Sequence, residues 1–149
     1  MVNRTLAAVS EAVQTNLELA RQGYELWNAS GLDALRERFW APDIVFYDLP
    51  EAPDTGIFRG AEECAARLRA VTESWDHLPQ FEVRSLEGCS DYILAAVELR
   101  VEGQGSGVAL AVPQFHVARW ADGRVHEWRI YQDADQARRE YEQLSSQSA

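Results

Sequence analysis

VALAVPQFHVARWADGRVHEWRIYQD, residues 108–133, contains two apolar-rich runs on either side of Ala121-Asp122-Gly123-Arg124. Asp-Gly between two such runs is among the strongest short-range signals for a β-hairpin, because both residues tolerate the positive φ angles of a tight turn. Side chains alternate between the two faces of a strand, so each run has an inner and an outer set of residues. We expect this hairpin to form a wall on which the rest of the chain packs.

The segments before the hairpin change from a helical to a strand-like pattern. Helices first and antiparallel strands second are typical of an α+β fold. We expect one domain over residues 1–149, with a curved antiparallel sheet of about four to six strands. Helices over its concave face would leave an apolar pocket at the open end. The first expected helix has an apolar stripe from Leu6 to Trp27. A Ser30–Asp33 capping box starts a second helix, which ends before Pro42. The elements expected after it are, in chain order, a strand at 43–48, a loop at 49–60, a helix from Gly60, a strand at 80–86, a turn at 87–91, a strand at 92–102, a turn at 103–107, the hairpin, and a short C-terminal helix.

The composition excludes several classes of partner. The net charge of −10, with no basic stripe, argues against a nucleic-acid ligand, which requires clustered positive charge. No apolar run is long enough to cross a bilayer, and the first residues lack the core of a signal peptide. Two cysteines, Cys64 and Cys89, do not form a disulfide framework, so we expect reduced thiols and a cytoplasmic location.

Motifs for metals, nucleotides and covalent catalysis are missing from the sequence. The three histidines, His77, His116 and His126, have neither HxH nor HExxH spacing. Neither GxSxG, a Walker loop nor GxGxxG occurs. We therefore expect a protein that works without a metal or a cofactor.

Four segments together resemble the nuclear transport factor 2-like superfamily, and within it the SnoaL-like and ketosteroid-isomerase-like domains. They are YELWNASGLDAL (24–35), APDIVFYD (41–48), FRGAEE (58–63) and FHVARWADGRVHEW (115–128). Each motif alone is weak, and their order and spacing carry the resemblance. It implies a cone-shaped fold with a deep apolar cavity, commonly a homodimer through the outer sheet face. Members include isomerases, cyclases and plain binding proteins, so the fold leaves the chemistry open.

Asp48 and His116 are the two candidate catalytic residues. Asp48 ends the first strand, where the resemblance implies the proton-shuttling Asp of the isomerases. An apolar environment would raise the pKa of this carboxyl group toward the range of a general base. His116 lies on the inner face of the hairpin and can donate a hydrogen bond or act as a base. The alternatives are a turn-capping Asp and a core His with a hydrogen-bonded neighbour.

Tyr24 is one position from the place where the isomerases carry an oxyanion-hole tyrosine, and Gly23 stands at that place. One residue is about 100° of helix rotation, so we expect Tyr24 to line the pocket rather than to act as a catalytic donor. For each aromatic residue a plain core role is the alternative. The full set of expected substrate-binding residues is Tyr24, Trp27, Phe46, Phe58, Trp75, Gln114, Trp120, Trp128 and Ile130.

Three functional hypotheses stay open. The first is an isomerase or cyclase without a cofactor that acts on an apolar carbonyl compound. The second is a small-molecule binding protein, and the third is a dimeric interaction module. The outer face of the hairpin would supply the dimer surface, with Phe115, Val117, Arg119, Arg129 and Tyr131.

Overall fold

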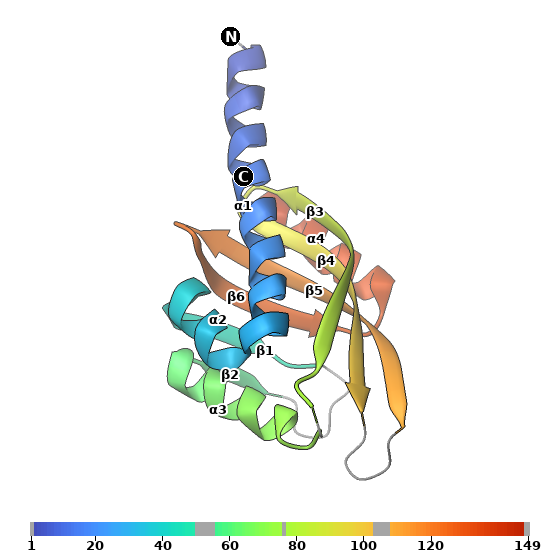
Figure 1. Cartoon of the computed structure of the whole chain (residues 1–149). Helices are drawn as coiled ribbons and strands as arrows, with labels where there is room; N and C mark the ends of the chain where they lie inside the picture. Colours follow the sequence, from blue (N-terminus) through green and yellow to red (C-terminus); the bar gives the residue numbers. More distant parts are fainter. Residues whose placement is uncertain (1, 50–55, 76, 103–107, 148–149) are drawn as a thin grey trace.

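A computed structural model describes residues 2–49, 56–75, 77–102 and 108–147, with side chains described from residue 11 onward. The expected α+β fold is confirmed: helices pack on a curved sheet with strand order β2-β1-β6-β5-β4-β3 (Figure 1). The elements are α1 (Val2–Ser30), α2 (Leu32–Phe39), β1 (Trp40–Tyr47), β2 (Ile57–Arg59), α3 (Ala61–Thr72), β3 (Gln80–Cys89), β4 (Tyr92–Glu102), β5 (Ala109–Ala121), β6 (Arg124–Tyr131) and α4 (Ala134–Gln147).

The hairpin predicted from Asp-Gly is β5–β6. Asp122 and Gly123 have φ angles of 54° and 75°, and the strands are antiparallel from Ala121 opposite Arg124 onward. Positive φ at both central residues matches the twist of the two strands, which is why Asp-Gly favours this turn. β5 also pairs with β4 along most of its length, from Ala109 to Arg119. The hairpin is therefore the centre of the sheet.

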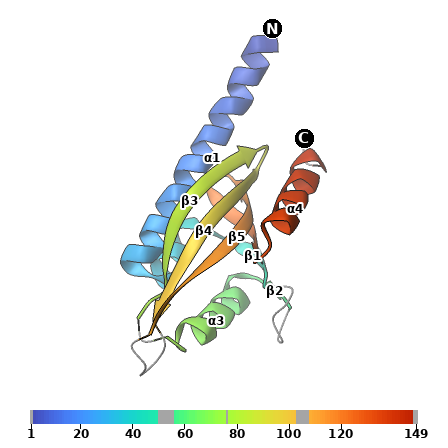
Figure 2. The ribbon, with the colours of Figure 1, turned by 90° about the vertical axis from the view of Figure 1, so that its right-hand side faces the viewer.

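The helices are divided unequally between the two faces of the sheet. α1 and α4 lie on opposite sides of it (Figure 2). The larger buried cluster, with Trp27, Phe46 and Trp120 among its members, lies on the concave side with α1, α2 and α3. A smaller cluster, which includes Val117 and Tyr141, lies between the convex face and α4. The concave side is therefore where a pocket can form.

One pair of strands departs from the expected antiparallel sheet, because β1 runs parallel to β6, with Phe46 beside Trp128. A parallel pair requires a long crossover connection, and here β2, α3, β3, β4 and β5 lie between the two strands in the chain. No local turn fixes the direction of β1, so the sequence pattern alone could not reveal it.

The expected loop at 49–60 contains the short strand β2, which pairs with β1 and places Phe58 opposite Phe46. Residues 50–55 of that loop lie outside the described residues, as does the whole turn expected at 103–107.

Two local expectations at turns were wrong. The residue before α2 is Gly31, with φ of 85° and no side-chain cap, so there is no Ser30–Asp33 capping box; Asp33 instead pairs with Arg69 at 2.6 Å. The turn expected at 87–91 is confined to residues 90–91, since β3 continues through Gly88. A Cβ atom at Gly88 would lie 2.7 Å from Val13 Cγ1 of α1. This glycine therefore permits close helix packing rather than a turn.

The outer face of the hairpin is partly covered within the chain. α4 contacts β4, β5 and β6, Val117 is fully buried under it, and Phe115 packs against the same cluster. The expectation that Val117 forms part of an exposed apolar surface was therefore wrong, because the C-terminal helix buries it, and Phe115 is partly buried beside it. None of the helices in the described part of the chain combines the length and apolar character that a membrane crossing requires.

Candidate functional site

A narrow apolar cavity lies between α1, α2 and the concave face of the sheet. Its volume is about 60 Å³. It exists because small residues, Ala20, Gly23, Ala95 and Ala118, face large aromatic ones across the layer. An engineered cavity of about 150 Å³ holds benzene, so a ring-sized ligand would require a wall side chain to move. The lining residues are Ala20, Gly23, Tyr24, Trp27, Leu35, Trp40, Phe81, Ile93, Ala95, His116, Ala118, Trp120, Val125 and Trp128.

The helical wall of the cavity comes from one face of α1. Ala20, Gly23, Tyr24 and Trp27 are three or four residues apart, which places them on the same side of the helix. The C-terminal end of α1 is attached to the edge strand β3. Trp27 Nε1 donates a hydrogen bond of 2.7 Å to the Pro79 carbonyl oxygen, which positions this wall.

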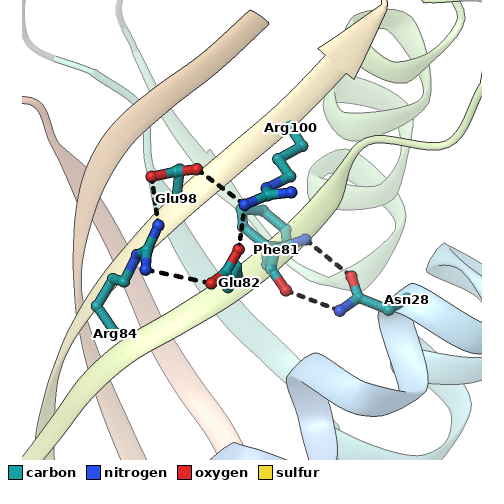
Figure 3. Close-up of polar contacts among 6 residues, drawn as sticks. All are labelled: Asn28, Phe81, Glu82, Arg84, Glu98 and Arg100. Carbon is teal, nitrogen blue, oxygen red and sulfur yellow. Dashed lines mark hydrogen bonds and ion pairs between the residues drawn. The ribbon is translucent and has the colours of Figure 1, made fainter. Parts of the chain in front are cut away.

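Asn28 makes the second attachment, and Figure 3 shows it. Its amide donates to the Phe81 carbonyl oxygen and accepts from the Phe81 N–H, each at 2.8 Å. The side chain thus pairs with the free edge of β3 as a neighbouring strand would. Because Phe81 is held in this way, its ring forms the wall opposite Tyr24, with 5.7 Å between ring centroids.

Three side chains form a hydrogen-bonded chain at the polar end of the cavity. Tyr24 Oη lies 2.7 Å from His116 Nδ1, and His116 Nε2 lies 3.1 Å from Gln114 Oε1. His116 and Gln114 are two residues apart on β5, so both point to the concave face. Tyr24 comes from α1, which means that the chain joins the helical layer to the sheet.

Aromatic rings surround His116. The ring centroids of Tyr24, Phe81 and Trp128 lie 5.8, 5.4 and 5.3 Å from that of the imidazole, and His116 is only 1% exposed. Burial lowers the pKa of His116 to about 3, because an apolar environment disfavours the charged imidazolium. Burial also raises the pKa of the Tyr24 hydroxyl above its ordinary value. Both groups are therefore neutral throughout the physiological pH range.

Asp48 lies apart from this chain, just past the end of β1, and is not among the lining residues. Arg67 of α3 holds its carboxylate, with Nη2–Oδ2 and Nε–Oδ2 distances of 2.6 and 2.8 Å. Its other oxygen accepts the Leu49 N–H at 2.7 Å. Only 10% of the Asp48 side chain is exposed. The structure thus places the two expected catalytic residues in different surroundings: His116 in the cavity wall, and Asp48 in an ion pair.

The expected binding residues are divided in the same way. Tyr24, Trp27, Trp120 and Trp128 line the cavity. The other five do not line it. Phe46 and Phe58 stack in the core with 6.1 Å between ring centroids, and Ile130 is buried in the same core. Gln114 lies behind His116, and Trp75 lies just past the end of α3, where its backbone N–H donates to the Thr72 carbonyl oxygen.

Sequence reasoning missed two large wall residues, Trp40 and Phe81. The sequence pattern predicts that Trp40 ends a helix, yet it is the first residue of β1 and lies beside Val125. Phe81 begins an expected strand, but nothing local indicates that Asn28 holds that strand against α1. The remaining lining residues that were not named are small or aliphatic, and such residues give no signal separate from the core.

Within the described residues, His, Cys, Asp and Glu side chains nowhere gather in a group of three that could hold a metal ion. The cavity offers aromatic surface and the neutral pair Tyr24–His116. Groups of this kind can form hydrogen bonds with a neutral, largely apolar molecule and can exchange a proton with it.

Solved structures with similar folds come from several bacteria. A candidate SnoaL-like polyketide cyclase from a Jannaschia species is 19% identical, with a TM-score of 0.69 over 84% of this chain and 90% of that one. A nuclear transport factor 2-like protein of unknown function from Burkholderia pseudomallei is 21% identical (TM-score 0.66; 83% and 95% covered). A protein with a ketosteroid-isomerase-like fold from Catenulispora acidiphila, solved with trimethylamine, is 16% identical (TM-score 0.64; 78% and 86% covered). At these identities the likeness establishes the fold alone.

The sequence comparison identifies the family more directly. No curated protein matches the chain. The family model of the SnoaL-like domain matches residues 20–128, from the wall of α1 to Trp128 in β6. The resemblance seen in four short motifs is thus confirmed, and the chain belongs to the SnoaL-like domain family.

Proposed function

We propose that the protein binds a small apolar carbonyl compound in the cavity and moves a proton on it, as an isomerase or cyclase without a cofactor does. The observation that carries the proposal is the 2.7 Å contact between Tyr24 Oη and His116 Nδ1 at the wall of an otherwise apolar cavity. A buried polar pair in such a cavity is the usual arrangement for orienting a ligand and exchanging a proton with it.

His116 is the proposed proton acceptor, and Tyr24 connects it to the ligand. An acidic hydrogen of the ligand would pass to Tyr24 Oη while the Tyr24 proton passes to His116 Nδ1; one bond to hydrogen breaks and one forms at each step. Burial disfavours the imidazolium, so the transferred proton is held only while the negative charge on the ligand stays beside it. Because charging the buried imidazole is unfavourable, the same burial also supports the alternative, in which the protein binds its ligand without transferring a proton.

Asp48 is the second proposed proton-transfer group. Because Arg67 and the Leu49 N–H engage its carboxylate, a catalytic role would require release from that pair. If His116 is the base, substituting His116 should remove activity, and if Asp48 is the base, substituting Asp48 should do so. Variants of the two residues therefore separate the two roles.

α-Deuteration of small ketones in D2O, followed by NMR with cyclohexanone as the reference, tests the proposal. We expect the wild-type protein to accelerate exchange, and His116→Gln and Tyr24→Phe to reduce the acceleration by about 10² or more. The exposed His77, paired with Glu102, provides the control His77→Gln. If Asp48→Asn alone removes exchange, Asp48 is the base. If no ketone exchanges but cyclohexanone still shifts the fluorescence of the lining tryptophans, the protein only binds. If neither occurs across a panel of ketones, the proposal is wrong.

The proposed homodimer would use the part of the outer sheet face that α4 does not cover. Ile57 of β2 is 51% exposed and pairs with Tyr47 of β1. The Arg129 guanidinium stacks over the Tyr47 ring, with its Cζ 3.8 Å from the ring centroid. These side chains point outward because their neighbours Phe46 and Phe58 point into the core. We expect Ile57→Glu to convert a dimer to a monomer in light scattering; a wild-type monomer would refute this part.

A further inference from the structure

We propose that Gln114 is a positioning residue that fixes which nitrogen of His116 carries the proton, so that Tyr24 offers the cavity a hydrogen-bond acceptor and selects ligands with a hydroxyl group. This inference rests on the proposed function, because it takes the cavity to be a binding site. It goes further by giving the direction of the hydrogen-bonded chain and the ligand group that this direction favours.

The direction follows from Gln114 Oε1. A carbonyl oxygen only accepts hydrogen bonds, so the nitrogen 3.1 Å from it, His116 Nε2, must be the one that carries the proton. Gln114 is buried, 8% exposed, which leaves no solvent to compete for this contact. A neutral imidazole has one N–H, and His116 is neutral in this environment. Its Nδ1 is therefore an acceptor.

Tyr24 must then donate its single hydrogen to His116 Nδ1 across 2.7 Å. Its oxygen keeps lone pairs but has no hydrogen left for a ligand. Within the described part of the chain, the Tyr24 hydroxyl has no hydrogen-bond partner besides His116. Both nitrogens of His116 are in use. Of the side chains that line the cavity, only Tyr24 thus retains an oxygen or nitrogen acceptor, because the remaining polar atoms are indole N–H donors.

A ligand that fits this wall carries a hydrogen-bond donor where it meets Tyr24. A hydroxyl group donates to the Tyr24 oxygen, whereas a ketone oxygen facing the same atom brings two acceptors together and leaves both unsatisfied. Among molecules of equal size and similar apolar surface, the hydroxyl compound should bind better. Gln114 does not itself line the cavity, so it acts on the ligand only through His116.

Cyclohexanol and cyclohexanone are a matched pair for this test, because they have the same number of heavy atoms. Titration against the fluorescence of the lining tryptophans should show cyclohexanol binding about tenfold more tightly, the difference that one satisfied hydrogen bond makes. Two-bond ¹H–¹⁵N correlation of the histidine rings, assigned with His116→Gln, should show His116 protonated on Nε2 only.

Gln114→Met removes the acceptor at Nε2 while keeping a side chain of similar length. We expect His116 Nδ1 to become protonated and donate to Tyr24, whose hydroxyl then turns to the cavity. The preference should shift toward cyclohexanone. Gln114→Glu keeps an acceptor beside Nε2 and should retain the Nε2 proton. A merely structural role of Gln114 would weaken both ligands equally and leave the tautomer unchanged.

The proposal is overturned if wild-type His116 carries its proton on Nδ1, or if Gln114→Met leaves the ratio of the two affinities unchanged. Should Gln114→Met fail to fold, the wild-type tautomer and the wild-type affinity ratio still decide the matter. Equal binding of the two ligands would refute this inference and leave the proposed function standing. If neither ligand binds while the tautomer is as stated, the proposed function is the part that fails.

Discussion

His116 in β5 and Asp48, just past the end of β1, are two polar groups held under different constraints. His116 is surrounded by rings and hydrogen-bonded to the neutral partners Tyr24 and Gln114. Asp48 is held by a charged partner, Arg67, at 2.6 Å. A buried neutral group costs little once its hydrogen bonds are made, whereas a buried charge requires an opposite charge. The difference is that the cavity wall holds neutral polar groups, whereas the charged pair lies outside the cavity.

The largest loss of stability expected from a single substitution at one pH comes from breaking the charged side of this comparison. Arg67→Met leaves the Asp48 carboxylate, 10% exposed, without its cationic partner, and we expect the free energy of unfolding in urea to fall by about 3 kcal/mol. The control is Arg69→Met, which breaks the exposed pair with Asp33 and should cost less than about 1 kcal/mol. Similar losses for the two variants would contradict the buried character of the Asp48 pair.

The pH dependence of stability tests the other half of the comparison, the neutral and buried His116. Because the pKa of His116 is lowered to about 3 in the folded protein, the unfolded chain binds an extra proton at pH values between about 3 and 6.5. The contribution of neutral His116 is complete above pH 6.5 and is lost as the pH falls through this window, by roughly 1.4 kcal/mol per pH unit. His116→Gln should flatten the slope of urea stability between pH 6.5 and pH 4, and His77→Gln should leave it in place. Equal slopes in the wild type and His116→Gln would show that His116 titrates normally.

A smaller loss is expected when the hydrogen-bonded chain is cut at its cavity end. Tyr24→Phe removes the donor to His116 Nδ1 and should lower the free energy of unfolding by about 1 kcal/mol. In the same variant cyclohexanol should lose its advantage over cyclohexanone, because the acceptor oxygen is gone. Tyr131→Phe, which removes a longer contact with Glu140 of 3.5 Å, is the matched control. An unchanged ligand preference in Tyr24→Phe would place the ligand hydroxyl elsewhere.

The smallest effect should have opposite signs for stability and for binding. A Cβ at Gly23 would lie 3.7 Å from both Leu35 Cδ1 and Trp120 Cη2, which is ordinary contact. Gly23→Ala should therefore raise stability by about 0.5–1 kcal/mol through helix propensity, and it should weaken cyclohexanol binding because the cavity narrows. Thermal unfolding and the same fluorescence titration measure the two effects. Tighter binding by this variant would show that ligands do not use the space beside Gly23.

Much of the fold and part of the site could be read from the sequence, because the relevant signals are local. Asp122-Gly123 specifies its own turn through backbone conformation. The alternation in β5 places Gln114, His116 and Trp120 on the inner face whatever the partner strands are. The helical spacing of Tyr24 and Trp27 likewise puts them on one face of α1.

Errors arose where one segment determines the environment of another. Gly88 resembles a turn residue until Val13 of α1 is seen against it. The alternation of side chains along β5 places Phe115 and Val117 on its outer face, yet α4 packs against that face. Neither effect leaves a trace in the neighbouring sequence, because the residues that cause it are far away in the chain.

The sequence alone determined the central hairpin, the inner position of His116 and membership of the SnoaL-like family, since turn chemistry, side-chain alternation and motif order are properties of neighbouring residues. Only the tertiary structure decided what the two candidate groups touch. Tyr24 contacts His116, which lies 92 residues later in the chain, and Arg67 of α3 contacts Asp48 at the end of β1. Whether a titratable side chain meets a neutral or a charged partner depends on how the layers pack. That packing made His116 a neutral group in the cavity wall and Asp48 one half of an ion pair.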